Sequence, residues 1–340
     1  MSHSLVALPD KFRGSLEAEE VANALVQAFV SREPGINALG MPLSDGGQGT
    51  LRCLVARVGA SIHEALVTGP YGAPITAKWA VLPDGTAVIE CAEICGWARV
   101  THHPDPMRST TAGVGELMTL VCRAGHSRII VAIGDTVTLD GGLGALEALA
   151  FSLSDSRVEV AADVDIPFTQ ASAVFGVQKG ASPAEVPLLT RRLEELRVRY
   201  IGDLGVDPEG FPCGGSGGGL AGALACLGAK CVPGFVLLSR LLGLSEALAA
   251  ATIVVTGEGR FDLTSLLGKA THRVLKACPA TARVGLLVGE ITPEAAALLP
   301  ENVSVVALTS YRPHRELAIR DARLLLDQAA GDLADTVLRG

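Results

Sequence analysis

The densest group of chemically active side chains lies in Ile253-Val-Val-Thr-Gly-Glu-Gly-Arg-Phe-Asp262, followed closely by Gly268-Lys269. The β-branched residues at its start predict a buried strand, and the two glycines predict a turn directly after it. Glu258 and Arg260 would then lie at the carboxyl end of a strand, where acids, cations and exposed amides can handle phosphate and metal ions. A lysine at a helix start opposes the helix dipole, so Lys269 fits a bound anion better than helix stabilisation. An ordinary turn with solvated charges is the alternative.

Two other loops combine an acid with paired glycines. Asp45-Gly-Gly-Gln-Gly-Thr50 follows the apolar Met41-Pro-Leu43, and Asp140-Gly-Gly142 follows a strand expected at residues 129–133, with Asp135 and Thr138 nearby. Both loops precede a predicted helix, so Asp45 has the alternative interpretation of a helix N-cap. Three loops of this kind in one chain favour a shared ligand over three unrelated turns.

Cations occur in two further loops. Asp10-Lys-Phe-Arg-Gly-Ser15 ends the first predicted strand and could hold a carboxylate or a phosphate, although Ser15 could also be a helix N-cap. Lys179 lies in the glycine-flanked turn Phe175-Gly-Val-Gln-Lys-Gly180. The glycine-rich residues 214–219 precede an apolar helix, and we interpret them as a flexible turn or a site of close helix packing.

Motifs and composition disfavour several classes of protein. The chain has neither Gly-x-x-x-x-Gly-Lys-Ser/Thr nor a Gly-x-Gly-x-x-Gly after a strand, which argues against a P-loop and a dinucleotide-binding fold. A net charge of -8 offers no basic surface to nucleic acid. The eight cysteines form no Cys-x-x-Cys pair, and with no signal-peptide pattern they predict free thiols in the cytoplasm. Charges interrupt the apolar residues 220–242, which predict a helix, a turn and a second helix instead of a membrane span.

The elements expected around these loops define an α/β protein. The 340 residues exceed what one hydrophobic core usually supports, and only 4% are aromatic, so the core must be mostly aliphatic. Strands are predicted at residues 5–8, 87–89, 129–133, 253–255, 284–288 and 303–308, and helices at 17–30, 115–123, 186–197, 271–277 and 315–333. This alternation predicts parallel sheets covered by helices. The rhythm breaks at 61–79 and at 214–219, so we expect an α/β domain of residues 61–224 inserted into a domain of residues 1–60 and 225–340.

In their order along the chain, these loops resemble those of the bacterial type I glycerate kinase family. Asp10-Lys-Phe-Arg-Gly-Ser15 is similar to the family's Asp-Ser-Phe-Lys-Gly-Ser, and Asp45-Gly-Gly-Gln-Gly-Thr50 to its Asp-Gly-Gly-Glu-Gly-Thr. The resemblance continues through Ser109-Thr-Thr-Ala-Gly-Val-Gly-Glu116, Gln178-Lys-Gly-Ala181, residues 214–227 and Thr256-Gly-Glu-Gly-Arg260. It implies two α/β domains, one with a flavodoxin-like parallel sheet split in sequence by the other, and an active site in the cleft between them.

The resemblance also implies an enzyme that uses ATP and Mg²⁺ to phosphorylate a hydroxyl of glycerate, with 2-phosphoglycerate as the expected product. Phosphoryl transfer needs positioning and charge neutralisation more than covalent chemistry, which suits loops of glycine, acid and cation. We expect Asp140 or Asp45 to orient or deprotonate the hydroxyl. Arg260 and Lys269 would neutralise the transferring phosphate, and Mg²⁺ would bind Glu258 and Asp262. The other expected contacts are Asp10, Lys11, Arg13, Gly14, Ser15, Gly46, Gly47, Gln48 and Thr138 for the acceptor, and Gly141, Gly142, Thr256, Gly257, Gly259, Gly268 and Lys179 for the nucleotide.

Several positions depart from the family pattern. The family's Glu is Gln48 here, and its Gly-Gly-Ser-Ala-Thr-Asn-Asp-Gly-Gly loop is Gly134-Asp-Thr-Val-Thr-Leu-Asp-Gly-Gly142. Leu139 cannot form a side-chain hydrogen bond as asparagine can. Two alternatives stay open: a paralogue that phosphorylates another small hydroxy acid or a polyol, and a non-catalytic ligand-binding relative, against which the retained acids and Lys269 argue. We expect a small anionic hydroxy acid and a nucleotide as partners of a monomer or homodimer, with no nucleic-acid or membrane partner.

Overall fold

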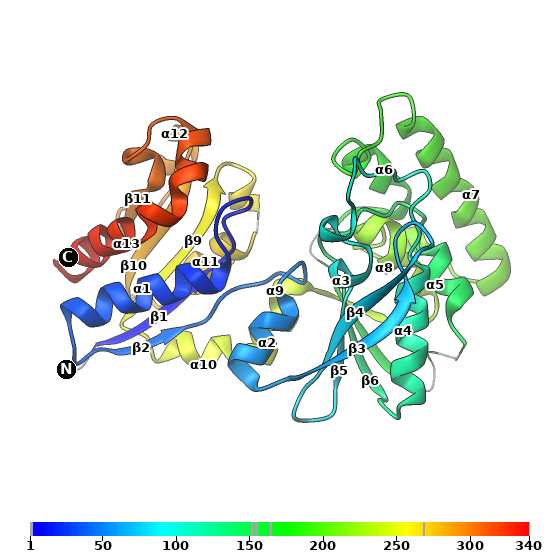
Figure 1. Ribbon diagram of the computed structural model, residues 1–340, viewed down its shortest axis with the longest axis horizontal. Helices are drawn as coiled ribbons and strands as arrows, with labels where there is room; N and C mark the ends of the chain where they lie inside the picture. Colours follow the sequence, from blue (N-terminus) through cyan, green and yellow to red (C-terminus); the bar gives the residue numbers. More distant parts are fainter. Residues whose placement is uncertain (1–2, 151–152, 154–155, 163–164, 268, 340) are drawn as a thin grey trace. The chain divides into compact units, whose positions relative to one another are not determined.

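The computed structural model describes residues 3–339 except 151–152, 154–155, 163–164 and 268 (Figure 1). The chain divides into two compact units. Unit 1 comprises residues 1–43 and 243–340, and unit 2 comprises residues 44–242. The sequence predicts an inserted domain of residues 61–224; in the structure, residues 44–60 and 225–242 also belong to unit 2.

Unit 1 is built on a five-stranded parallel sheet in the order β11-β10-β9-β1-β2. Counted in chain order within the unit, this is the 2-1-3-4-5 order of flavodoxin-like folds. The expectation of a flavodoxin-like sheet split in sequence by a second α/β domain is therefore confirmed. The strands are β1 (Ser4–Pro9), β2 (Asn37–Gly40), β9 (Ile253–Phe261), β10 (Arg283–Ile291) and β11 (Val303–Ala307).

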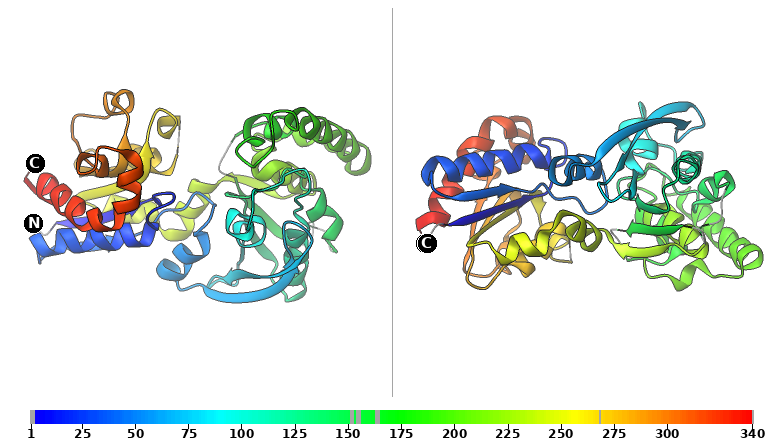
Figure 2. Two further views of the ribbon diagram at one scale, coloured as in Figure 1. Left: turned by 45° about the horizontal axis from the view of Figure 1, so that its top comes forward. Right: turned by 90° about the horizontal axis from the view of Figure 1, so that it is seen from below.

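Helices cover both faces of the unit 1 sheet. Buried residues of α1 and α13 pack on one face against Leu5 and Val255, and the two helices lie together on that side in both views of Figure 2. The opposite face, with Leu286 and Phe261, packs against Leu275 of α11 and Ala295 of α12. The helices are α1 (Ala18–Arg32), α10 (Leu244–Ala249), α11 (Ala270–Ala277), α12 (Pro293–Ala296) and α13 (Arg315–Arg339), with short 3-10 turns at Ser265–Leu267 and Leu308–Ser310.

Unit 2 contains a mixed sheet of six strands in the order β3-β4-β5-β6-β7-β8. β4 pairs antiparallel with β3 and with β5, and β5 to β8 are parallel. The hairpin of β3 and β4 is the feature that breaks the α/β rhythm of the sequence at residues 61–79. The strands are β3 (Ser61–Thr68), β4 (Pro74–Val81), β5 (Ala87–Glu90), β6 (Arg128–Ala132), β7 (Arg157–Ala162) and β8 (Lys230–Pro233).

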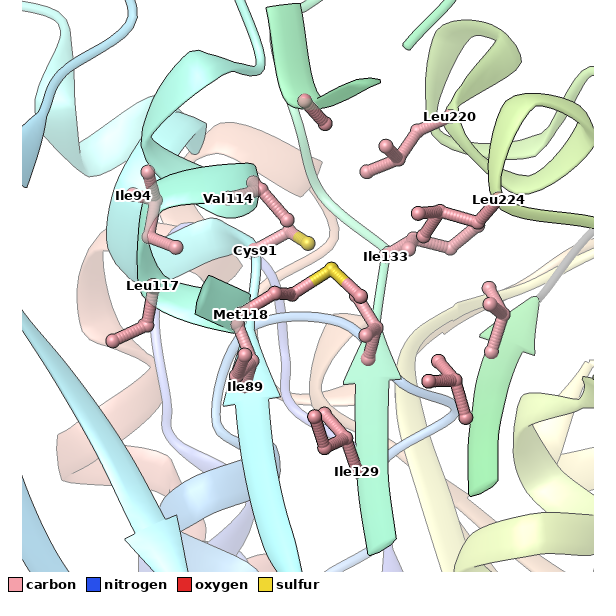
Figure 3. Close-up of a cluster of buried hydrophobic side chains, with 14 of the residues drawn as sticks. Ile89, Cys91, Ile94, Val114, Leu117, Met118, Ile129, Ile133, Leu220 and Leu224 are labelled. Carbon is pink, nitrogen blue, oxygen red and sulfur yellow. The ribbon is translucent and has the colours of Figure 1, made fainter. Parts of the chain in front are cut away.

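The main core of unit 2 is aliphatic, as the low aromatic content predicts. Figure 3 shows Ile89 and Ile129, from neighbouring strands, facing Met118 of α4 and Leu224 of α8. Loops at the carboxyl ends of these strands are thereby fixed on a rigid base. The helices are α2 (Thr50–Val58), α3 (Ala92–Cys95), α4 (Ala112–Arg123), α5 (Leu143–Ala148), α6 (Ala171–Phe175), α7 (Val186–Leu204), α8 (Leu220–Cys226) and α9 (Gly234–Leu242), with 3-10 turns at Trp97–Arg99, Phe168–Gln170, Pro208–Gly210 and Ser216–Gly219.

Each strand and helix predicted from the sequence overlaps an observed element of the same type. The prediction of two helices joined by a turn at residues 220–242 was incomplete, because β8 lies between α8 and α9. All eight cysteines are free thiols. Among the described helices, none combines the length and apolarity needed to span a bilayer.

Candidate functional site

The topology of unit 1 marks the carboxyl ends of β1 and β9 as a ligand-binding position. β1 and β9 are neighbours, yet the helices that follow them, α1 and α11, pack on opposite faces. Such a switch point leaves a crevice at the carboxyl ends of the two strands. The residues at these ends are the loop 10–16 and the last residues of β9, which carry five of the charged residues singled out in the sequence: Asp10, Lys11, Arg13, Glu258 and Arg260.

The Thr-Gly-Glu-Gly-Arg segment is part of a strand, so the predicted turn was wrong. β9 continues to Phe261 and pairs with β10 as far as Ile291. Neither glycine has a positive φ. A Cβ on Gly257 would lie 2.1 Å from Leu287 O, and one on Gly259 would lie 3.1 Å from Phe12 Cα, so both glycines permit close approach of neighbouring backbone.

The side chain of Thr256 also takes part in the sheet. It is fully buried, and its hydroxyl donates a hydrogen bond of 2.7 Å to Leu8 O. Because the hydroxyl has a single proton, Thr256 could donate a hydrogen bond to a nucleotide only if this bond broke. Gly268, the other glycine predicted to contact the nucleotide here, lies outside the described residues.

The loop after β1 is anchored at both ends. Asp10 N donates to Gly257 O at 2.7 Å, and the buried Phe12 ring fixes the middle of the loop. Gly14 has a φ of 81° and lets the chain reverse, while Ser15 donates to Phe12 O at 3.1 Å. Ser15 is not the N-cap of α1, because Glu17 occupies that position in a capping box with Glu20. Lys11 is therefore held partly buried and Arg13 exposed, both beside the end of β9.

Charged side chains form a cluster around the end of β9. Glu258 is 7% exposed, and burial raises its pKa to about 7, an effect that the ammonium of Lys269, 4.0 Å from Oε2, opposes. Its Oε1 is buried without a hydrogen-bond partner. Arg260 Nε lies 3.3 Å from Asp262 Oδ2 and 3.9 Å from Glu290 Oε2. Hydrogen bonds from Thr264 lower the pKa of Asp262.

The metal-binding potential of this cluster is limited. Within the described part of the chain, no three acidic, histidine or cysteine side chains form a group that could hold a metal ion. Glu258 and Asp262 each face a cation, and only Glu258 has a buried oxygen without a donor. Such a donor set fits a Mg²⁺ ion that takes most of its ligands from phosphate and water, and does not fit a cage built from protein alone.

The Asp45 loop in unit 2 lies over the carboxyl end of β6. Gly134 N donates to Gly46 O at 2.9 Å, and Gln48 N donates to Asp135 Oδ2 at 3.0 Å. A Cβ on Gly46 would lie 3.1 Å from Ala161 O, at the end of the adjacent β7. The loop is therefore fixed by backbone contacts to two strand ends.

Asp45 is not a helix N-cap, so that alternative interpretation was wrong. The N-cap of α2 is Gly49, and the first amides of the helix donate to the buried carboxylate of Glu90 at the end of β5, from Gly49 N at 3.0 Å and from Leu51 N at 2.9 Å. Because Glu90 performs the capping, the partly buried carboxylate of Asp45 is not required for it.

Asp140 is surrounded by hydrogen-bond donors. Its Oδ2 accepts from Thr111 N at 2.7 Å, Thr111 Oγ1 at 2.8 Å and Gly144 N at 3.2 Å, and its Oδ1 accepts from Gly142 N at 3.1 Å. Burial raises the pKa of Asp140, and these hydrogen bonds oppose the rise. The carboxylate ties together the starts of α4 and α5, which makes it an anchor of both helices.

The glycines after Asp140 are packing residues. Gly141 N donates to Gly218 O at 3.0 Å, and Gly142 N is used by Asp140, so both amides already have acceptors. A Cβ on Gly142 would lie 2.6 Å from Ala223 Cβ, and one on Gly218 would lie 2.0 Å from Thr138 O. This confirms the close-packing interpretation of residues 214–219.

Thr138 and Lys179 lie inside unit 2. Thr138 is fully buried, and its hydroxyl has no hydrogen-bond partner. Lys179 is 7% exposed and its ammonium donates to the carbonyl and the hydroxyl of Thr136, at 3.1 Å for the hydroxyl. Lys179 therefore holds the loop after β6 from within, and Thr138 is a buried residue of that loop.

Sequence reasoning did not single out Glu90 and Thr111 and noted Asp135 only as a neighbour of the Asp140 loop. Glu90 follows directly after the predicted strand 87–89, and an acid at a buried strand end was a usable signal. Thr111 lies in the family-like segment 109–116, but that segment did not indicate its role, which depends on contact with a loop 29 residues away.

Comparison with known proteins covers nearly the whole chain. A sequence profile described as the glycerate kinase family matches residues 5–158 and 152–338. The glycerate 2-kinase of Escherichia coli (strain K12) is 34% identical over 301 residues, 78% of this chain and 79% of that protein. The glycerate kinase of Bacillus subtilis (strain 168) is 32% identical over 376 residues, 98% of this chain and 97% of that protein.

A solved structure agrees with the sequence relatives. The crystal structure of a putative glycerate kinase 2 from Salmonella typhimurium LT2 superposes with a TM-score of 0.80 at 32% identity, covering 100% of this chain and 99% of that chain. Profile, sequence relatives and structure all point the same way: the chain belongs to the glycerate kinase family.

Proposed function

We propose that this protein is an ATP-dependent kinase that phosphorylates a hydroxyl of glycerate to give 2-phosphoglycerate. Membership of the glycerate kinase family supports the reaction class. The observation that carries the proposal is the cluster of cations and acids at the switch point of a flavodoxin-ordered sheet, where Arg260 and Lys269 lie within 4.0 Å of carboxylates that a phosphate could replace as their partners.

In this mechanism unit 1 binds and neutralises phosphate. Arg260 and Lys269 stabilise the negative charge that spreads over the transferring phosphoryl oxygens. Mg²⁺, when bound, would neutralise further phosphate charge, with Glu258 and Asp262 as its protein ligands. Lys11 and Arg13 would pair with the carboxylate of the acceptor, because both cations belong to the loop that meets the end of β9.

In unit 2, Asp45 is the acid that we assign to the acceptor hydroxyl. It lies in a loop fixed to two strand ends and is only partly buried, whereas Asp140 is saturated by four hydrogen bonds. Asp45 would orient the hydroxyl and accept its proton as the new O–P bond forms. Asp140, Gly141, Gly142, Thr138 and Lys179 then act by supporting the loops and not by touching substrate.

A coupled assay of ADP release with D-glycerate tests the activity. The purified protein should turn over only with nucleotide, glycerate and a divalent cation together. Adding enolase identifies the product, since 2-phosphoglycerate is its direct substrate and 3-phosphoglycerate is not. Asp45→Asn should lower kcat by about 10² to 10⁴-fold, the usual contribution of a positioned general base. No ADP release with glycerate would overturn the glycerate assignment.

The same assay separates the alternatives left open by the sequence. A diverged paralogue would release ADP with another small hydroxy acid or polyol and not with glycerate; the exposed Gln48 in the acceptor loop is the observation that favours screening such compounds. A non-catalytic relative would bind nucleotide in calorimetry and release no ADP with any acceptor.

A further inference from the structure

The loop after β6 contains an acid that this mechanism does not use, Asp135. Its φ of 56° is the one positive φ of a non-glycine residue in the part of the chain that the structure describes. This left-handed conformation is unfavourable for residues with a Cβ, although Asp tolerates it better than most. It persists in a folded protein only where the surroundings fix it.

The neighbours of Asp135 fix the loop from several directions. On one side, Gly134 N donates to Gly46 O at 2.9 Å. On the other, Thr136 accepts two hydrogen bonds from the buried ammonium of Lys179, and Val137 N donates to Cys95 O at 2.9 Å. These contacts leave Asp135 at the carboxyl end of an interior parallel strand, the edge at which α/β sheets bind ligands.

The carboxylate of Asp135 determines where the Asp45 loop lies. Its Oδ2 accepts a hydrogen bond of 3.0 Å from Gln48 N. The same oxygen occupies the space beside Gly47, since a Cβ there would lie 2.5 Å from it. One oxygen therefore both holds the backbone of Gln48 and restricts residue 47 to glycine.

We propose that Asp135 is a positioning residue for the acceptor substrate: by holding Gln48 N–H, it fixes the side chains of Asp45 and Gln48 toward a small hydroxy acid. This inference rests on the function proposed above, in which Asp45 acts on the acceptor hydroxyl. It assigns Asp135 no contact with nucleotide and no proton transfer. Its effect should therefore appear in kcat and KM for the acceptor and not in nucleotide affinity.

Two substitutions at this position separate the hydrogen bond from the backbone conformation. Asp135→Gly removes the acceptor but keeps the left-handed φ free of strain, and the relief of strain offsets part of the entropy cost of glycine, so the variant should fold with a Tm within about 5 °C of the parent. Its kcat/KM for glycerate should fall about ten-fold, the usual effect of losing a hydrogen bond to a charged acceptor, through a lower kcat as Asp45 loses its position and a higher KM for glycerate, while the KM for ATP stays within about two-fold. Asp135→Asn keeps an oxygen that can accept from Gln48 N, and its kcat/KM should stay within about three-fold of the parent.

Hydrogen exchange of the 45–50 peptide provides a readout that needs no turnover. Exchange at Gln48 N should accelerate at least about ten-fold in Asp135→Gly and stay near the parent rate in Asp135→Asn. Asp203→Asn is the control, because Asp203 pairs with Arg199 on the exposed face of α7 and should change neither measurement.

Two kinetic results would overturn the inference. One is a kcat/KM for glycerate within two-fold of the parent in Asp135→Gly; the other is an Asn variant as impaired as the Gly variant, which would assign the effect to charge. If the parent phosphorylates no acid, the proposed function fails, while unchanged exchange at Gln48 N in Asp135→Gly would independently refute the positioning contact.

Discussion

The strand-end sites of the two units use the same residue types in different ways. In unit 1, acids pair with cations that are half exposed, as in Arg260 with Asp262, at 49% and 24% side-chain exposure. In unit 2, Asp140 and Glu90 are buried and accept hydrogen bonds from backbone amides. An exposed ion pair contributes little to stability and can be exchanged for a ligand's charge, whereas a buried carboxylate held by amides cannot be released without loss of structure. In the function proposed above, the exposed charges of unit 1 would therefore serve a transient partner, whereas the buried carboxylates Asp140 and Glu90 of unit 2 hold loops in place.

Loss of Arg260 should produce the largest effect. Arg260→Ala should lower kcat/KM by roughly 10³-fold, about 4 kcal/mol of transition-state stabilisation, because its partner would be the transferring phosphate. The free energy of unfolding should change by less than about 1 kcal/mol. Steady-state kinetics and urea unfolding measure both. Arg191→Ala is the matched control, since Arg191 forms an exposed pair with Glu195 and should alter neither. A loss below ten-fold in Arg260→Ala would place Arg260 among ordinary surface pairs.

Asp140 should show the opposite pattern. Asp140→Ala should lower the free energy of unfolding by about 3 kcal/mol, because it leaves buried amides of two helix starts without their acceptor. Activity per folded molecule should stay within about ten-fold of the parent at low temperature. Glu147→Ala on the same helix α5 is the control, because Glu147 is exposed and pairs only loosely with Arg199. A stable but inactive Asp140→Ala protein would instead assign Asp140 to the chemistry.

Glu258 should make the free energy of unfolding depend on pH. Burial raises its pKa from 4.5 to about 7, so between these values the folded protein keeps a proton that the unfolded chain releases. The free energy of unfolding must therefore fall as pH rises through this range. Glu258→Gln should remove this slope and be about 2 kcal/mol more stable than the parent at pH 8, with little difference near pH 4.5. Urea unfolding at several pH values measures the slope, and a slope that survives the substitution would locate the proton elsewhere.

Asp262 should have the opposite effect on the pH dependence of stability. Its pKa is lowered, chiefly by the hydroxyl of Thr264, so its contribution to stability is present above its unfolded pKa and is lost as pH falls through the folded value. Asp262→Asn should therefore be less stable than the parent at neutral pH and converge with it in acid.

The smallest expected effect concerns the glycine of the loop after β1. Gly14 has a φ of 81° and open space where a Cβ would lie, so Gly14→Ala should cost about 1 kcal/mol of backbone strain and nothing from steric overlap. Gly202 in α7 also has open space but no positive φ, and Gly202→Ala should stabilise the protein by up to about 1 kcal/mol. Thermal unfolding of both variants measures the difference, and equal shifts would contradict the assigned backbone conformation.

The sequence was most informative where local pattern and structure coincide. Runs such as Leu286 to Val288 are apolar because both faces of a parallel strand are buried, and this predicts α/β architecture. It was least informative for Gly257 and Gly259. Glycines mark a turn and a crowded strand equally well, and the crowding comes from Leu287 and Phe12, which no local pattern brings together.

The two Asp-Gly-Gly loops show a similar limit. Asp45 and Asp140 each begin an Asp-Gly-Gly sequence. Asp140 is an anchor because the start of α4 at Thr111 contacts it, whereas Asp45 does not cap α2 because Glu90 accepts the first amides of that helix. These partners are 29 and about 40 residues away, so the distinction depends on tertiary contacts. The Asp-Gly-Gly motif alone therefore could not predict which of the two carboxylates anchors helices and which could act on a substrate.

The pairing of β1 with β9 affects when unit 1 can fold during synthesis. Leu5 aligns with Ile253, so until β9 emerges, β1 has only β2 as a sheet partner. At roughly 5 to 20 residues per second, synthesis of the intervening segment takes on the order of 10 to 50 s. Unit 2 is one continuous segment of the chain and can complete its folding in that interval. Until β9 is made, the edge of β1 that pairs with β9 has no partner strand. A chain that stalls or is cut before β9 would expose that edge to chaperones and proteases.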